Sequence, residues 1–186
     1  MRPVSGTLTR RGALGGAAAL ALASCGGGDP APKGTPRAGS GAGLLNSIVA
    51  FEHAAIAACS KATIGEVLRG EGRSYARAIR EREIANAERM ADLVRELGGT
   101  PPRSRALADY ARLFPELRTE ADALHFARDL EERLVRAYLE GLRLLPGAEQ
   151  RRAAAQVAAA QAEDLAVVHV LSGGPAAPEP FVTGAL

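Results

Sequence analysis

Two polar residues interrupt the apolar side of a helical segment that spans residues 73–99. On a heptad ruler laid through Ile79 and Met90, the inward positions include Glu83 and Asn86, which lie three residues apart. Burial of a carboxylate costs several kcal/mol unless a cation, a proton or a hydrogen-bond donor compensates it. The pair therefore predicts a polar site inside the protein.

The same ruler places polar residues at inward positions near the middle of three further helical segments. The first segment contributes Glu52, the third contributes Glu131, and the fourth contributes Gln161 and Asp164, again three residues apart. If these four levels coincide, the carboxylates of Glu52, Glu83, Glu131 and Asp164 converge in the core. Such a cluster requires cations, bound protons or arginine partners.

The surrounding pattern predicts an all-α, antiparallel four-helix bundle over residues 44–172. The helices are expected at 44–60, 73–99, about 119–145 and 148–171, with one helical turn near 107–113 in the longer loop at 103–118. Thr119 and Asp122 have the spacing of a capping box. The short connections make the first and second helices antiparallel neighbours, and likewise the third and fourth.

The chain resembles the ferritin-like di-iron carboxylate bundles over about residues 44–172, both in the order of its polar positions and in the segment ERMADLVRELGGTPP. In that family, two helices each supply one Glu and two each supply Glu-x-x-His. The resemblance places the single carboxylates at Glu52 and Glu131. It places one pair at Glu83 and Asn86 and the other at Gln161 and Asp164.

Half of the ligand set implied by the resemblance is missing from this sequence. Asn86 and Asp164 stand at the two His positions, and Gln161 stands at one Glu position. Carboxamide oxygen is a poor substitute for neutral imidazole as an iron ligand. The first interpretation is a degenerate bundle without a redox metal, a non-catalytic binding or structural module in which Asn86 and Gln161 hydrogen-bond partly protonated carboxylates.

Two other interpretations remain open from the sequence. One of them is a ferritin-like protein that binds a divalent metal, Mn or Fe, and has storage or oxidase-type activity. Its ligands would be Glu52, Glu83, Glu131 and Asp164, an all-oxygen set that would favour Mn, Mg or Ca over iron. Alternatively, the inward positions are misassigned and the pattern is a coincidence among solvated charges. The sequence thus leaves an enzymatic activity undecided, and the loss of the ligands argues against one.

The N-terminus predicts export and lipid anchoring. Residues 9–14, TRRGAL, resemble a twin-arginine signal, and the apolar run 13–23 is too short to span a bilayer. Residues 22–25, LASC, resemble a lipobox, which implies cleavage after residue 24 and a lipid on Cys25. We therefore expect a signal peptide at 1–24, a flexible Gly/Pro linker at 25–43 and an irregular tail at 173–186. The expected location is the outer face of the cytoplasmic membrane.

The remaining features exclude several function classes. The 23 basic and 21 acidic residues give a net charge of +2 and no case for nucleic-acid binding. The chain has no phosphate-binding Gly-rich loop, no Cys-x-x-Cys and no Gly-x-Ser-x-Gly. We expect Cys59 to be a small buried apolar residue and the three histidines to lie at the edge of the core. Four arginines of the second helix are expected on a solvated face: Arg80, Arg82, Arg89 and Arg95. The sequence leaves open whether the protein has a protein partner or forms a homodimer.

Overall fold

The protein was analysed as a computed structural model that describes residues 41–64 and 67–176. The predicted signal peptide, Cys25, the linker up to residue 40 and the tail after Ala176 lie outside these residues. The described residues belong to one unit of the chain, Pro32–Leu186.

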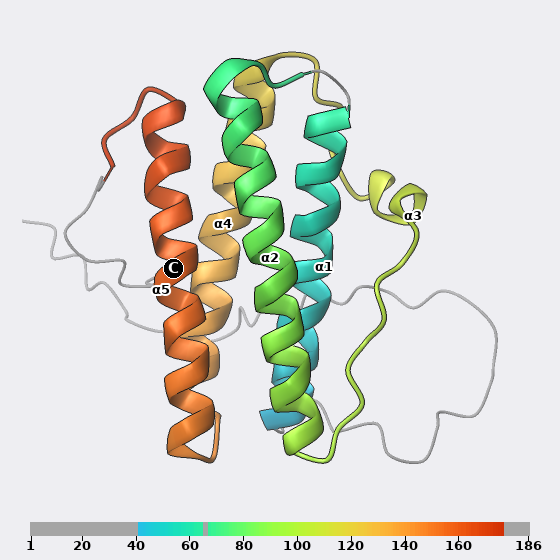
Figure 1. The fold of residues 1–186 in the computed structure, drawn as a ribbon, viewed down its shortest axis with the longest axis vertical. Coiled ribbons are helices and arrows are strands. Elements are labelled where there is room, and N and C mark those ends of the chain that lie inside the picture. The colour runs from blue at the N-terminus through green and yellow to red at the C-terminus, as the bar shows by residue number, and fades with distance from the viewer. Residues whose placement is uncertain (1–40, 65–66, 177–186) are drawn as a thin grey trace, which may run out of the picture. The chain divides into compact units, whose positions relative to one another are not determined.

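Four long helices and one short helix form the described part of the chain, which contains no strand (Figure 1). This confirms the all-α prediction. The first helix begins at Gly41, earlier than expected, so residues 41–43 are helical and not linker. The helices are α1 (Gly41–Ile64), α2 (Gly70–Glu96), α3 (Leu107–Ala111), α4 (Glu120–Leu142) and α5 (Ala148–Leu171).

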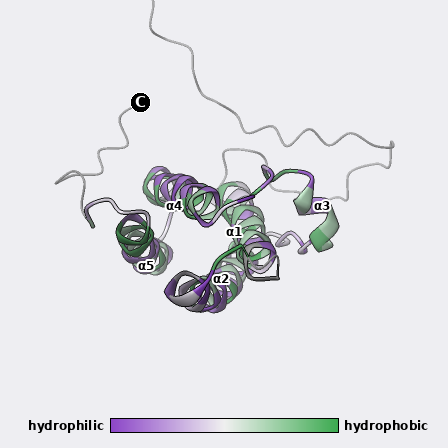
Figure 2. Ribbon diagram, turned by 90° about the horizontal axis from the view of Figure 1, so that it is seen from above, coloured by the Kyte–Doolittle hydropathy of each residue, from purple (hydrophilic) through white to green (hydrophobic). Residues whose placement is uncertain are grey.

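The long helices surround a common axis in the order α1, α2, α5, α4 (Figure 2). Each helix runs antiparallel to both of its neighbours in this ring (Figure 1). Short connections join α1 to α2 and α4 to α5, whereas residues 97–119 return along the outside of the bundle from the end of α2 to the start of α4. On this crossover, α3 packs against α1. The topology is an antiparallel four-helix bundle with one long connection.

The predicted capping box starts α4. The backbone N–H of Asp122 donates to Thr119 Oγ1 at 3.1 Å, and the backbone N–H of Thr119 donates to Asp122 Oδ2 at 2.8 Å. The two side chains thus pair backbone donors that lack partners within the helix. These bonds to Thr119 hold the pKa of Asp122 below its usual value.

Two helices end in the same way, each with a glycine in the left-handed conformation. Gly98 after α2 has φ +74° and Gly173 after α5 has φ +80°. The next residue then donates its N–H back to the last turn, from Gly99 to Val94 O at 2.8 Å and from Gly174 to His169 O at 2.9 Å. A side chain with a Cβ would be strained at Gly98 and Gly173, so these positions favour glycine.

The core has apolar layers at the level where α1 begins and α2 ends. Leu45, Met90, Leu93 and Leu134 are fully buried there, each stabilising the fold by roughly 1.5–3 kcal/mol. Gly141 lets α4 approach α1 closely, since an added Cβ would lie 3.1 Å from Leu44 Cδ2. Towards the other end of the bundle the buried residues are smaller, with many alanines.

In the described part of the chain, one segment has the length and apolar composition needed to cross a membrane, Gly41–Lys61 of α1. In the structure this segment is a bundle helix that buries Leu45, Ile48 and Val49 against the other helices. It also places Glu52, a carboxylate, in the core.

Candidate functional site

Five polar side chains from the four long helices are buried in the middle of the bundle. None of them is more than 2% exposed. The interpretation of these positions as solvated surface charges is therefore wrong. The five residues, named here the polar layer, are Glu52 of α1, Glu83 of α2, Glu131 of α4, and Gln161 and Asp164 of α5.

Gln161 links three helices through its amide group. Its Nε2 donates to Glu83 Oε2 at 2.8 Å and contacts both carboxylate oxygens of Glu52, at 3.2 and 3.3 Å. The hydroxyl of Tyr138 on α4 also donates to Glu52 Oε1. Gln161 therefore hydrogen-bonds the carboxylates as predicted, with a protein N–H pointing at two of the four acidic groups.

Asn86 lies at the edge of this network. Its side chain is half-buried, and its Nδ2 is shielded from solvent without a hydrogen-bond partner. Asn86 lies almost one helical turn beyond Glu83 on the same helix, close enough for its amide to oppose the rise in the pKa of the Glu83 carboxyl group. The predicted contact of Asn86 with the carboxylates is thus limited to Glu83 and is weaker than that of Gln161.

Asp164 is neutralised by an arginine that the sequence pattern assigned to the solvated face. Arg82 Nε donates to Asp164 Oδ2 at 3.0 Å, and a terminal nitrogen of the same guanidinium contacts Oδ1. The hydroxyl of Tyr75 donates to Oδ1 at 2.8 Å. The placement of Arg82 on the solvated face is thus corrected. Arg82 precedes Glu83 on α2, and its long side chain reaches around the helix to α5.

Burial changes the protonation of the remaining carboxyl groups. Burial and the neighbouring Glu83 raise the pKa of Glu52 well above its usual value. Burial, followed by the charges of Glu83 and Asp164, raises the pKa of Glu131 in the same way. Burial also raises the pKa of Glu83, although the Gln161 N–H opposes this. Each of these shifts favours the neutral, protonated form of the carboxyl group.

Three acceptor oxygens of the polar layer have no hydrogen-bond partner. They are Glu83 Oε1, Glu131 Oε2 and Gln161 Oε1. Each comes from a different helix, and each is shielded from solvent. A buried acceptor without a partner is costly, so these atoms mark the part of the layer that is least satisfied by the protein itself.

All three histidines lie in the described residues, and none of them hydrogen-bonds a carboxylate of the polar layer. His53 is half-buried with a pKa lowered by burial, His125 is exposed, and His169 Nε2 lies 3.6 Å from Glu132 Oε1 on the outside of α4. Cys59 is half-buried, and burial raises the pKa of its thiol, which therefore remains neutral.

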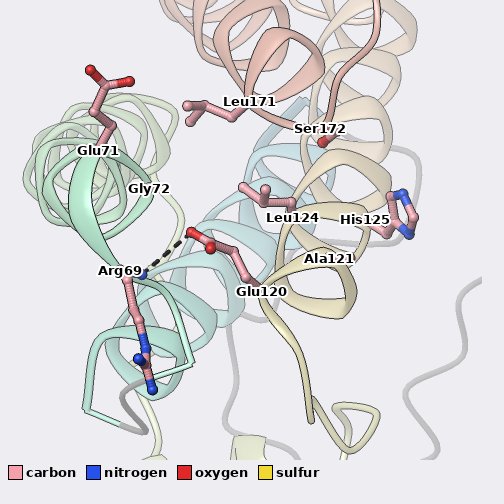
Figure 3. A pocket seen from close by; sticks show the side chains of 9 residues that line it. All are labelled: Arg69, Glu71, Gly72, Glu120, Ala121, Leu124, His125, Leu171 and Ser172. Carbon is pink, nitrogen blue, oxygen red and sulfur yellow. Dashed lines mark hydrogen bonds between the residues drawn. The ribbon is translucent and has the colours of Figure 1, made fainter.

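A separate pocket of about 480 Å³ lies at the end of the bundle where α2 and α4 begin and α5 ends (Figure 3). Leu124 of α4 and Leu171 of α5 line it, and Glu120 accepts a hydrogen bond from the backbone N–H of Arg69 at 3.4 Å (Figure 3). A narrow apolar cavity of about 30 Å³, also lined by Leu124 and Leu171, extends along the bundle to Glu131. That volume suffices for one or two water molecules.

The fold and the order of polar residues match a known family. The chain matches the ferritin-like domain family over residues 41–174 and belongs to it. No curated protein matches the chain significantly. The family assignment confirms the resemblance seen in the sequence, and it raises the question whether the polar layer fits the two metal ions that the resemblance implies.

The contacts of the polar layer do not fit a two-metal centre. Both oxygens of Asp164 accept hydrogen bonds from α2 side chains, and the N–H group of Gln161 points at Glu52 and Glu83. A donor N–H and a guanidinium thus face the oxygens that would coordinate the metals. Within the described residues, no group of three or more His, Cys, Asp or Glu has an arrangement that could hold a metal ion.

Proposed function

We propose that this ferritin-like protein is exported, anchored by lipid on Cys25, and acts at the cell envelope as a non-catalytic binding or structural module without a redox metal. The observation that best supports the proposal is the contact of Arg82 with Asp164, at the position where the resemblance implies a histidine ligand. The protein supplies its own cation there. Gln161 and bound protons compensate the other three carboxyl groups.

The N-terminal sequence supports the location in this proposal. The twin-arginine-like residues 9–14 and the lipobox-like residues 22–25 predict attachment to the outer face of the cytoplasmic membrane, with residues 26–40 between Cys25 and the bundle. The membrane is the partner that this sequence implies.

One observation favours a second function, that of a divalent-cation-binding protein with storage or oxidase-type activity. Glu83 Oε1, Glu131 Oε2 and Gln161 Oε1 are buried acceptors without partners. Oxygen donors of this kind suit Mn, Mg or Ca better than iron. Under this alternative, one cation would lie among these atoms while Arg82 remains on Asp164.

Metal analysis of the purified full chain separates the two functions. The first proposal predicts less than a stoichiometric amount of any divalent metal, Mg and Ca included, and no rapid oxidation of added ferrous iron above the rate in buffer. About one metal ion per chain, or ferrous oxidation that Glu83→Ala abolishes, would contradict the proposal and support the alternative.

A further inference from the structure

Arg82 differs from the other arginines that form ion pairs in the described residues. Its partner Asp164 has a side chain that is only 2% exposed, although 41% of the Arg82 side chain is accessible to solvent. In the remaining arginine–carboxylate pairs, the carboxylates are exposed. Arg82 therefore enters the polar layer from the surface between α2 and α5, and its charged group ends on a buried anion.

The position of the Arg82 guanidinium is fixed from several sides. Its Cζ lies 5.3 Å from the centre of the Tyr75 ring, a cation–π contact. Tyr75 precedes Arg82 by about two turns of α2 and therefore lies on the same face of the helix. Because the Tyr75 hydroxyl also donates to Asp164, the ring and the carboxylate hold the guanidinium between them. A planar group bound in this way is rigidly oriented.

We infer that Arg82 is the specificity-determining residue that keeps divalent cations out of the polar layer, by placing a fixed positive charge on Asp164. The inference rests on the proposed function, since it explains how a ferritin-like bundle with four buried carboxylates stays free of metal. A cation that entered beside Glu83 and Glu131 would be repelled by the guanidinium at short range. Without Arg82, Asp164 becomes a buried anion that keeps only the Tyr75 hydroxyl as a partner, and its charge acts on Glu83 and Glu131, each of which has an oxygen without a partner.

The inference predicts that Arg82→Gln turns the polar layer into a site for a hard divalent cation. We expect the purified full chain with this substitution to bind about one Mn²⁺, measured by electron paramagnetic resonance of the free ion. Its affinity should exceed that of the wild type by about 100-fold or more. Two further variants show whether the charge is the cause. Arg82→Lys keeps a cation at this position and should still exclude Mn²⁺. Arg80→Gln removes a charge from the same helix, where Arg80 Nε donates to Ser60 Oγ, and should bind Mn²⁺ no better than the wild type.

A second substitution serves as a control in case Arg82→Gln does not fold. If Arg82→Gln alone does not fold because Asp164 is left uncompensated, Mn²⁺ added during refolding should rescue it. Arg82→Gln combined with Asp164→Asn should fold without Mn²⁺ and bind none. Failure of Mn²⁺ to bind or rescue Arg82→Gln, with a metal-free wild type, would overturn the inference and leave the proposed function intact. Equal Mn²⁺ binding by the wild type and Arg82→Gln would contradict both. Mn²⁺ binding by the wild type that becomes tighter in the variant would contradict both, because Arg82 would then weaken cation binding without excluding cations.

Discussion

Glu83 is the residue at which the interpretations of the polar layer differ most clearly. Its Oε2 accepts the shortest hydrogen bond that Gln161 makes, whereas its Oε1 has no partner. If no cation is bound, Glu83→Gln removes a buried charge and keeps the shape of the side chain. We expect the free energy of unfolding at neutral pH to rise by about 1–3 kcal/mol, as measured by chemical denaturation.

The control for this substitution is Glu88→Gln, an exposed carboxylate on the same helix, where the change should stay within about 0.5 kcal/mol. Repeating the denaturation of both variants with a chelator identifies a bound metal. If Glu83→Gln is destabilising and the chelator destabilises the wild type equally, a cation is bound and the metal-free interpretation fails.

At the scale of the element, the start of α4 depends on a local hydrogen-bond pattern. Thr119→Ala removes the side-chain oxygen that accepts the Asp122 N–H. We expect a loss of about 1 kcal/mol in the free energy of unfolding, the usual cost of removing an N-cap. Ser104→Ala, an exposed change in the crossover, serves as the control and should be near neutral. An equal effect of both substitutions would show that the capping box does not stabilise α4.

The helices differ in what joins them across the bundle. Apolar contacts of Leu45, Met90 and Leu134 join α1, α2 and α4. Hydrogen bonds join α2 to α5, from Arg82 and Tyr75 to Asp164 and from Gln161 to Glu83. Polar contacts in the core are directional, so they fix the relative height of the helices more strictly than apolar packing does. The polar layer therefore sets the register of α5 against α2.

At the scale of the whole molecule, the raised pKa values couple folding to pH. Glu52, Glu83 and Glu131 have folded-state pKa values above their usual 4.5, so the folded protein binds more protons than the unfolded chain. This contribution to stability is fully present below the unfolded pKa and is lost as pH rises through the folded pKa. We expect the free energy of unfolding to fall as the pH rises through the folded-state pKa values of these groups, which lie above 4.5.

His53 opposes this trend, because burial lowers its pKa and it therefore favours folding at higher pH. The measurement is best made in a His53→Gln background, by denaturant titration at each pH. Glu52→Gln in the same background should reduce the slope. Stability that increases with pH in the His53→Gln variant would contradict the assignment of bound protons to the polar layer.

Substitution of Cys25 tests the proposal that the whole molecule is attached to a membrane. We expect Cys25→Ser to move the protein from the membrane fraction to the soluble fraction, because the lipidated thiol would be lost. Cys59→Ser is the matched control and should leave the distribution unchanged. A Cys25→Ser variant that stays with the membranes would contradict the lipoprotein proposal.

The helices, their caps and the buried positions were predictable from the sequence because each depends on residues close together in the chain. Glu52, Glu83, Glu131, Gln161 and Asp164 lie at inward heptad positions, and all five are buried. The capping box at Thr119 likewise needs only four consecutive residues. The coincidence of the four polar levels followed from the antiparallel order and the short connections of the helices.

Only the tertiary structure decided how the negative charge of the polar layer is compensated. The side chain of Arg82 starts outside the heptad seam, and whether it reaches Asp164 depends on the distance between α2 and α5. The same holds for Tyr75, whose partner lies 89 residues away in the sequence. Asn86, at an inward position, was expected to hydrogen-bond the carboxylates, and it acts only on Glu83 of its own helix while its Nδ2 makes no hydrogen bond to another helix. A heptad pattern gives the direction of the Cα–Cβ bond, whereas the end of a long polar side chain is placed by partners on other helices.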